Sequence, residues 1–196
     1  MFTGIITDIG RVREISGEKL DRRFRIETGY DTAAIDMGAS ISHSGCCLTV
    51  VDKGSGWFDV DVSGETLAVT TLSDWLKGTE INLERAAKLG DEMGGHIVSG
   101  HVDGVGEVLD IVPEGGSHRI HIRAPKPLHR YIAPKGSITV EGVSLTVNAV
   151  EDDVFGVNII PHTLKVTTLG RLKSGARVNL EIDMLARYAA RWQETA

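Results

Sequence analysis

Short runs of alternating hydrophobic and polar residues dominate the chain and predict an all-β protein. Many short strands at regular spacing, separated by turns that contain Gly, are typical of a barrel. In the first half the runs are rich in Val, Ile and Thr and cover residues 3–15, 24–27, 40–51, 57–62 and 80–84. Short helical connectors are predicted near residues 30–35, 65–72, 128–132 and 162–169.

The same residues recur at a constant distance along the chain. Gly45, Leu48, Thr49 and Val50 recur 97 positions later as Gly142, Leu145, Thr146 and Val147, and the same offset relates Phe58, Thr66, Leu72, Asn82 and Glu84 to Phe155, Thr163, Leu169, Asn179 and Glu181. Near the start the offset is 96, so that Gly4 corresponds to Gly100. A period of this length fits a small complete domain rather than a solenoid unit. We therefore predict two similar domains, residues 1–96 and 97–183.

The pattern changes after Asp183, where apolar residues fall at helical spacing on one face. The stripe consists of Met184, Leu185, Tyr188, Ala189 and Trp192. Asp183 can cap this helix, which is predicted over residues 184–196 and has no counterpart after the first repeat. Self-association would bury the stripe most simply, and folding back onto the chain's own barrel is the alternative.

Charge and composition exclude several classes of function. Asp and Glu outnumber Lys and Arg by 27 to 21, which disfavours a nucleic-acid partner. Because no apolar run approaches the ~20 residues of a membrane span and the N-terminus lacks a basic signal region, we expect a cytoplasmic protein without membrane contact. The two cysteines, Cys46 and Cys47, are neighbours that point to opposite faces of a strand, so free thiols are expected.

Small polar residues occupy equivalent strand positions in the two repeats. Alternation places Cys47 and Thr49 on one face, opposite the core residue Leu48, and Ser144 and Thr146 take the same face opposite Leu145. Such groups suit a ligand with carbonyls, ring nitrogens and hydroxyls. They could merely fill an outer β face, but their duplication favours two similar ligand sites.

The segment from Gly94 to His101 invites a metal interpretation that the spacing does not support. Positions five apart on an extended strand face opposite ways, and no carboxylate or thiolate stands at useful spacing from His96 and His101, so no metal site is predicted. His101 replaces Ile5 of the first repeat and supplies a group that titrates near neutrality; a surface histidine bonded to its neighbours is the alternative.

Further differences between the repeats indicate that the two halves bind similar molecules and treat them differently. The differing pairs are Cys47 and Ser144, His43 and Val140, Ser44 and Glu141, and Asp61 and Asn158. The Gly-containing stretches at residues 54–56 and 104–106 are too short and too strand-like for a dinucleotide fingerprint.

The chain resembles the riboflavin synthase family over nearly its whole length. The resemblance rests on residues 1–6, 44–50, 84–86, 94–101, 142–147 and 161–164 taken together. It implies two six-stranded Greek-key barrels in tandem plus a C-terminal amphipathic helix, a homotrimer held by those helices, and no cofactor. It also implies a transferase that dismutates two 6,7-dimethyl-8-ribityllumazines into riboflavin and 5-amino-6-ribitylamino-uracil, the last step of riboflavin biosynthesis. Association with lumazine synthase stays open.

The resemblance also implies which residues bind the two lumazines. In the first barrel they are Gly4, Ile5, Ile6, Ser40, Cys47, Leu48, Thr49, Asp61, Val62, Ser63, Gly64, Glu65 and Thr66. In the second they are Gly100, His101, Val102, Lys135, Ser144, Leu145, Thr146, Asn158, Ile159, Ile160, Pro161, His162 and Thr163, with Asp183 near its end. Each site is then completed by the first barrel of one subunit facing the second barrel of another.

Catalytic roles follow from the same resemblance. His101, Ser144 and Thr146 are expected to activate the methyl group of one lumazine, and Cys47 with Ser40 to serve the ring that takes a nucleophile. Asp183 is also expected among the catalytic residues. Glu141 departs from the Asp that many members have before the Gly of the second motif. The rival interpretations are a non-catalytic lumazine- or flavin-binding relative and, without a motif in its favour, a sugar or nucleotide carrier.

Overall fold

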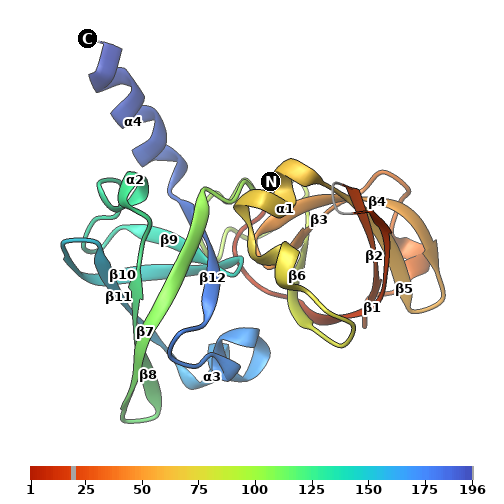
Figure 1. Ribbon diagram of the computed structural model, residues 1–196, viewed down its shortest axis with the longest axis horizontal. Coiled ribbons are helices and arrows are strands. Elements are labelled where there is room, and N and C mark those ends of the chain that lie inside the picture. Colours follow the sequence, from red (N-terminus) through yellow and green to blue (C-terminus); the bar gives the residue numbers. More distant parts are fainter. Residues whose placement is uncertain (19–20, 196) are drawn as a thin grey trace.

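Two closed antiparallel barrels of six strands each make up most of the computed structural model, which describes residues 1–18 and 21–195 (Figure 1). The first barrel consists of β1 (Asp8–Glu18), β2 (Asp21–Glu27), β3 (Ser40–His43), β4 (Cys46–Gly54), β5 (Trp57–Ser63) and β6 (Glu80–Arg85). The second consists of β7 (Gly104–Glu114), β8 (Ser117–Arg123), β9 (Ser137–Val140), β10 (Val143–Glu151), β11 (Val154–Ile159) and β12 (Arg177–Ile182).

The two barrels share one topology. Around the first the strands follow the order β1-β2-β5-β4-β3-β6, and the second repeats this order with the corresponding strands. Each barrel has its own buried apolar core, built around Phe24 and Phe58 in the first and around Phe155 and Ile122 in the second. The predicted all-β class with duplicated barrels is confirmed, whereas the domain boundaries at residues 96 and 183 stay a prediction.

Short helices connect the strands close to the predicted places. They are η1 (Thr32–Ala34), α1 (Gly64–Val69), η2 (Thr71–Asp74), α2 (Lys126–His129), α3 (Pro161–Val166) and η3 (Thr168–Arg171). Ser63 caps α1 by accepting a hydrogen bond from the Thr66 amide, while Pro161 opens α3, where its missing N–H costs nothing.

Two predicted strand limits were wrong. The first strand begins at Asp8 rather than at residue 3, because the preceding segment pairs with another part of the chain. The run at residues 40–51 is two strands joined by a tight turn, at which Ser44 and Gly45 have φ values of 46° and 88°. Alternation continues across such a turn, so the hydrophobic pattern alone did not reveal it.

The turns at Ser44–Gly45 and Glu141–Gly142 lie against each other between the barrels. A Cβ atom added to Gly142 would lie 2.7 Å from the Gly45 amide nitrogen, so glycine is needed for this close approach. Ser44 and Glu141 are both buried here, and His43 is buried in the first core beside Phe58. These three residues therefore take part in packing, and the expectation that the differences between the repeats alter ligand treatment stays a prediction.

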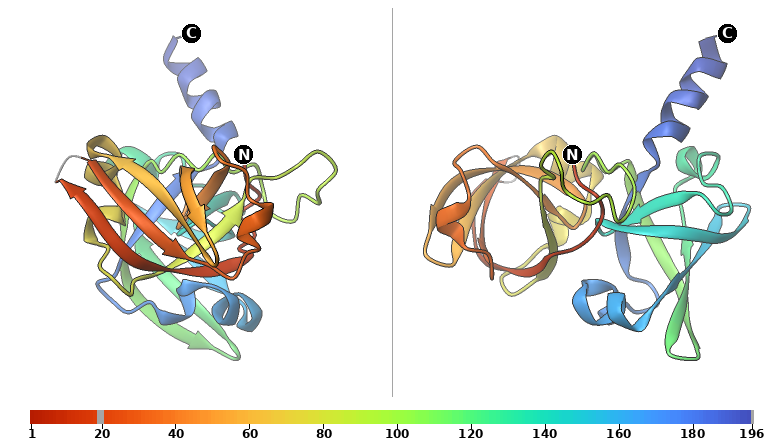
Figure 2. Two further views of the ribbon diagram at one scale, coloured as in Figure 1. Left: turned by 90° about the vertical axis from the view of Figure 1, so that its right-hand side faces the viewer. Right: turned by 180° about the vertical axis from the view of Figure 1, so that it is seen from behind.

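Helix α4 (Met184–Thr195) extends away from the second barrel (Figures 1 and 2). Asp183 accepts a hydrogen bond from the Leu185 amide at 2.8 Å, as predicted for a cap, and Arg187 forms a two-pronged ion pair with Asp103. Leu185, Tyr188 and Trp192 are 78, 66 and 77% exposed, so the helix does not fold its apolar stripe back onto the barrel. Among the helices of the described residues, none has the length and apolar character to span a bilayer.

Candidate functional site

Two segments cross between the barrels and pair with each other, residues 1–7 before β1 and residues 86–103 before β7. Phe2 donates from its amide to the Val98 carbonyl at 2.8 Å, and the Val98 amide donates back to the Phe2 carbonyl at 3.0 Å. Figure 2 shows the N-terminus between the two barrels, where this pairing takes place. Each segment is thereby directed toward the barrel of the other repeat.

Each crossing segment is hydrogen-bonded to a strand of the opposite barrel, β10 or β4, that carries predicted site residues. The Ser144 amide on β10 donates to the Gly4 carbonyl, and the Cys47 amide on β4 donates to the Gly100 carbonyl, both at 2.8 Å. In agreement, Ile6 packs against the second core and Val102 against the first. The prediction that Gly4–Ile6 belong with Cys47, and Gly100–Val102 with Ser144, was therefore wrong, because the segments cross between the repeats.

Glycine is required where each segment crosses. A Cβ atom on Gly4 would lie 2.5 Å from the Ser144 Cβ, and one on Gly100 would lie 2.6 Å from the Cys47 Cβ. Both glycines also have positive φ, 77° and 79°, which an L side chain rarely adopts. Gly4 and Gly100 correspond to each other in the repeat, and each brings the backbone into contact with a predicted site residue, Ser144 or Cys47.

Two buried glutamates hold the crossing segments. Glu84 on β6 accepts hydrogen bonds from the amides of Thr3 and Gly4 at 2.7 and 2.9 Å, and Glu181 on β12 accepts from Ser99, Gly100 and His101 at 2.7, 2.9 and 3.1 Å. Burial raises the pKa of both carboxyls, and these amide donors act in the opposite direction. Neither glutamate was among the predicted site residues, although their recurrence at the offset of 97 was a signal.

The first-barrel site lies around the start of β4. Cys47 is half-buried, Thr49 is exposed on the same face, and Ser40 pairs with Thr49 across β3 and β4, so the structure brings these three together. Since β4 and β5 are antiparallel, the end of β5 and α1 lie at the same end of the barrel. That end supplies the rest of the predicted set, Asp61, Val62, Ser63, Gly64, Glu65 and Thr66.

A cavity of about 610 Å³ opens beside Asp61 and Val62. Arg23 on β2 binds both carboxylate oxygens of Asp61, at 2.7 and 2.9 Å, and thereby holds the pKa of that carboxyl below its ordinary value. A guanidinium and a carboxylate at one rim can bind the hydroxyls of a polyol chain by donating and accepting hydrogen bonds.

The second-barrel site repeats this arrangement around the start of β10. Ser144 is half-buried and Thr146 exposed, whereas Leu145 packs against the core. Lys135 lies on the loop before β9, with its amide bound to the Val147 carbonyl at 2.7 Å. The end of β11 and α3 supply Asn158, Ile159, Ile160, Pro161, His162 and Thr163, and Asn158 donates to Glu114.

The histidine in contact with Ser144 is His96 rather than His101. His96 Nδ1 lies 2.7 Å from Ser144 Oγ, whereas His101 is exposed and follows Gly100 on the segment that contacts Cys47. His101 thus belongs with the first-barrel site, which corrects its predicted partnership with Ser144 and Thr146. The sequence pattern indicated His96 only as a possible metal ligand on a strand, but residues 94–101 form no strand and make a single bridge, at Val98.

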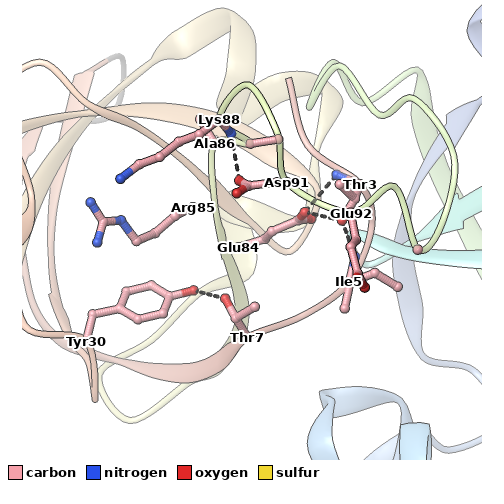
Figure 3. A pocket seen from close by; sticks show the side chains of 12 residues that line it. Thr3, Ile5, Thr7, Tyr30, Glu84, Arg85, Ala86, Lys88, Asp91 and Glu92 are labelled. Carbon is pink, nitrogen blue, oxygen red and sulfur yellow. Dashed lines mark hydrogen bonds between the residues drawn. The ribbon is translucent and has the colours of Figure 1, made fainter.

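A further cavity, of about 590 Å³, is lined in part by Thr3, Ile5 and Thr7 of the N-terminal crossing segment (Figure 3). Its wall includes Ile5 and Tyr30, and the Tyr30 hydroxyl bonds the Thr7 hydroxyl at 2.5 Å. Burial raises the pKa of Tyr30 to about 12. Lys88 and Asp91 of the segment after β6 also line the cavity. Of the residues that line it, only Ile5 belongs to the predicted site.

Each of the two repeats matches a known domain family. The lumazine binding domain model matches residues 3–86 and 99–183. Riboflavin synthase from Brucella abortus is 54% identical over 97% of both chains, and that from Mycobacterium tuberculosis strain H37Rv is 44% identical over the whole of both.

Solved structures give the same picture of the fold. LumP complexed with riboflavin superposes with a TM-score of 0.86 at 28% identity, over 93% of this chain and 99% of that one. LumP complexed with 6,7-dimethyl-8-(1'-D-ribityl) lumazine gives a TM-score of 0.84 at 27% identity, over 92 and 98%. With two matched lumazine-binding domains and full-length synthase relatives, the chain belongs to the riboflavin synthase family.

Proposed function

We propose that each barrel end binds one lumazine and that the two crossed segments make the two sites equivalent in shape but different in chemistry. The activity is riboflavin synthesis, in which one 6,7-dimethyl-8-ribityllumazine gives four carbons to a second and leaves as 5-amino-6-ribitylamino-uracil. The observation that carries the proposal is the paired contact of Gly4 with Ser144 and of Gly100 with Cys47.

The difference between the two sites matches the two tasks of the reaction. The C7 methyl of one lumazine is acidic because its carbanion delocalises into the ring, so one site needs proton removal. The other lumazine must be attacked at C7 before it gives up four carbons. Ser144 and Thr146 serve the first task, and Cys47 with Ser40 and the neighbouring His101 serves the second.

The two lumazines meet between subunits in this proposal. The exposed stripe of α4 supports a homotrimer, since Leu185, Tyr188 and Trp192 would otherwise leave a large apolar surface in water. A first barrel of one subunit then faces a second barrel of the next. Holding two rings face to face contributes to catalysis, because fixed orientation can be worth ~7 kcal/mol or more.

A lumazine or riboflavin carrier is the second candidate, favoured by the similarity to the LumP complexes. The two functions differ in turnover. Purified protein dialysed against a chelator is incubated with 6,7-dimethyl-8-ribityllumazine, and riboflavin is measured by fluorescence after chromatography. We expect one riboflavin for every two lumazines consumed, without added metal, nucleotide or flavin. Binding without riboflavin formation would favour the carrier, and activity restored only by a divalent ion would contradict the cofactor-free mechanism.

A further inference from the structure

His96 lies within hydrogen-bond distance of the hydroxyl of Ser144. Its Nδ1 lies 2.7 Å from Ser144 Oγ, and its Nε2 lies 3.4 Å from the hydroxyl of Thr139 on β9. The ring is half-buried, whereas Thr139 is 1% exposed. The hydroxyl of Ser144, on the predicted ligand face of β10, thus has a ring nitrogen within hydrogen-bond distance.

The backbone around His96 is built for this contact. The His96 amide donates to the Thr3 carbonyl at 3.2 Å. A Cβ atom on the preceding Gly95 would lie 2.0 Å from the Thr3 oxygen and 2.8 Å from the Ser144 Cβ, so any side chain there would push the segment away. Gly95 therefore permits the approach that lets His96 reach Ser144.

The environment of the ring favours a neutral imidazole that can accept a proton. The hydroxyls of Ser144 from β10 and Thr139 from β9 contact the ring, and the charge of Asp183 after β12 acts on it. Burial lowers the pKa of His96, and the charge of Asp183 opposes that effect. With Nε2–H directed to Thr139, Nδ1 is free to accept the hydrogen of the Ser144 hydroxyl.

We propose that His96 is a positioning residue that turns the lone pairs of Ser144 Oγ toward the lumazine and accepts the proton of that hydroxyl during methyl activation. The inference rests on the proposed function and adds a residue to it. In this step the methyl C–H bond breaks and its proton goes to Ser144 Oγ. The Ser144 O–H bond breaks and that proton goes to His96 Nδ1, while the C–H electron pair moves into the lumazine ring. Asp183 stabilises the resulting imidazolium.

Two variants of His96 separate proton acceptance from structure. His96→Asn places an amide near the position of Nδ1, where it can bond Ser144 but cannot accept a proton at neutral pH. His96→Ala removes both functions. His129→Asn, on an exposed residue at the end of α2, is the matched control. Circular dichroism and lumazine binding establish that the variants fold.

Methyl exchange and riboflavin formation are measured on the full chain. Exchange of the C7 methyl protons of the lumazine with D₂O is followed by proton NMR. We expect kcat and enzyme-dependent exchange to fall about 100-fold in both His96 variants, the usual scale of acid–base catalysis, with KM changed less than about threefold. The acid limb of the wild-type kcat profile reports protonation of His96 and should vanish in His96→Asn.

Three outcomes would overturn the proposal, namely wild-type exchange in His96→Ala, wild-type kcat in His96→Asn, or an acid limb that persists in His96→Asn. If His96→Ala does not fold, His96→Asn alone decides. Failure of the proposed function is recognised separately, because the wild-type protein would then form no riboflavin.

Discussion

Asn82 and Asn179 occupy equivalent positions on β6 and β12, and each donates from its side-chain amide to the turn of the other barrel. Asn82 Nδ2 lies 2.8 Å from the Glu141 carbonyl oxygen, and Asn179 Nδ2 lies 3.0 Å from the Ser44 carbonyl oxygen. Their side-chain oxygens accept from the amides of Thr168 and Thr71, both at 2.8 Å. The barrels are thus joined by reciprocal buried hydrogen bonds.

Loss of one of these asparagine side chains should destabilise the chain strongly. Asn179→Ala leaves the buried amide of Thr71 and the carbonyl of Ser44 without partners, which should lower the free energy of unfolding by about 3 kcal/mol. Urea unfolding measures this change. Asn148→Ala is the control, since the buried Oδ1 of Asn148 makes no hydrogen bond within the described residues. An equal loss of unfolding free energy in the two variants would contradict the role of the Asn179 hydrogen bonds.

Glu141 should make stability depend on pH. Burial raises its pKa from 4.5 to about 7, against hydrogen bonds from the Asn179 amide and the Ser44 hydroxyl. The folded state therefore binds this proton more tightly than the unfolded state, so the contribution of Glu141 to stability is fully present below about pH 4.5 and is lost as pH rises through about 7. The shift corresponds to about 3 kcal/mol. Unfolding across this range should show that fall for the wild type, less of it for Glu141→Gln, and the full wild-type fall for the control Glu151→Gln, at an exposed residue.

The crossed segments predict that each buried glutamate acts on the site of the opposite barrel. Glu181→Gln removes an acceptor for the Gly100 segment, which lies against Cys47, so iodoacetamide should alkylate Cys47 about fivefold faster, as expected for a loss of about 1 kcal/mol. Glu84→Gln, although in the same barrel as Cys47, should leave that rate unchanged, because Glu84 holds the segment beside Ser144. Mass spectrometry measures the rates, and a larger effect of Glu84→Gln would refute the crossing of the segments.

Removal of residues 184–196 should separate folding from assembly. Each barrel has its own core, so the truncated chain should keep its β-type circular dichroism and bind lumazine. Without the exposed stripe of α4 it should sediment as a monomer and form riboflavin poorly. A truncated chain that remains a trimer with full activity would show that α4 does not assemble the subunits.

Subunits disabled in opposite barrels should rescue each other. One chain carries Ser40→Ala with Cys47→Ala, and the other carries Ser144→Ala with Thr146→Ala. In co-refolded mixed trimers about a quarter of the interfaces between a first and a second barrel should be intact, provided that sites are shared between subunits. Riboflavin formation is compared with each parent at equal total protein. Activity no greater than the sum of the parents, with mixed trimers confirmed by mass, would place both halves of a site in one chain.

The sequence by itself determined the barrels and their duplication. Alternation with a period of two is a local property of each strand, and it placed Leu48 in the core and Cys47 and Thr49 on the opposite face. The repeat offset likewise marked Gly4 and Gly100 as equivalent positions. Local signals of this kind survive in a single sequence because each strand must satisfy them wherever it packs.

Only the tertiary structure decided which segment serves which barrel. The bridge between Phe2 and Val98 joins residues far apart in the chain. In neither segment does the hydrophobic pattern indicate which segment it pairs with. The contact of His96 with Ser144 depends on that bridge, since it turns residues 94–101 toward the N-terminal segment before β7 begins. Pairing between distant segments is chosen by the packing of the whole chain, so residue spacing could not reveal it.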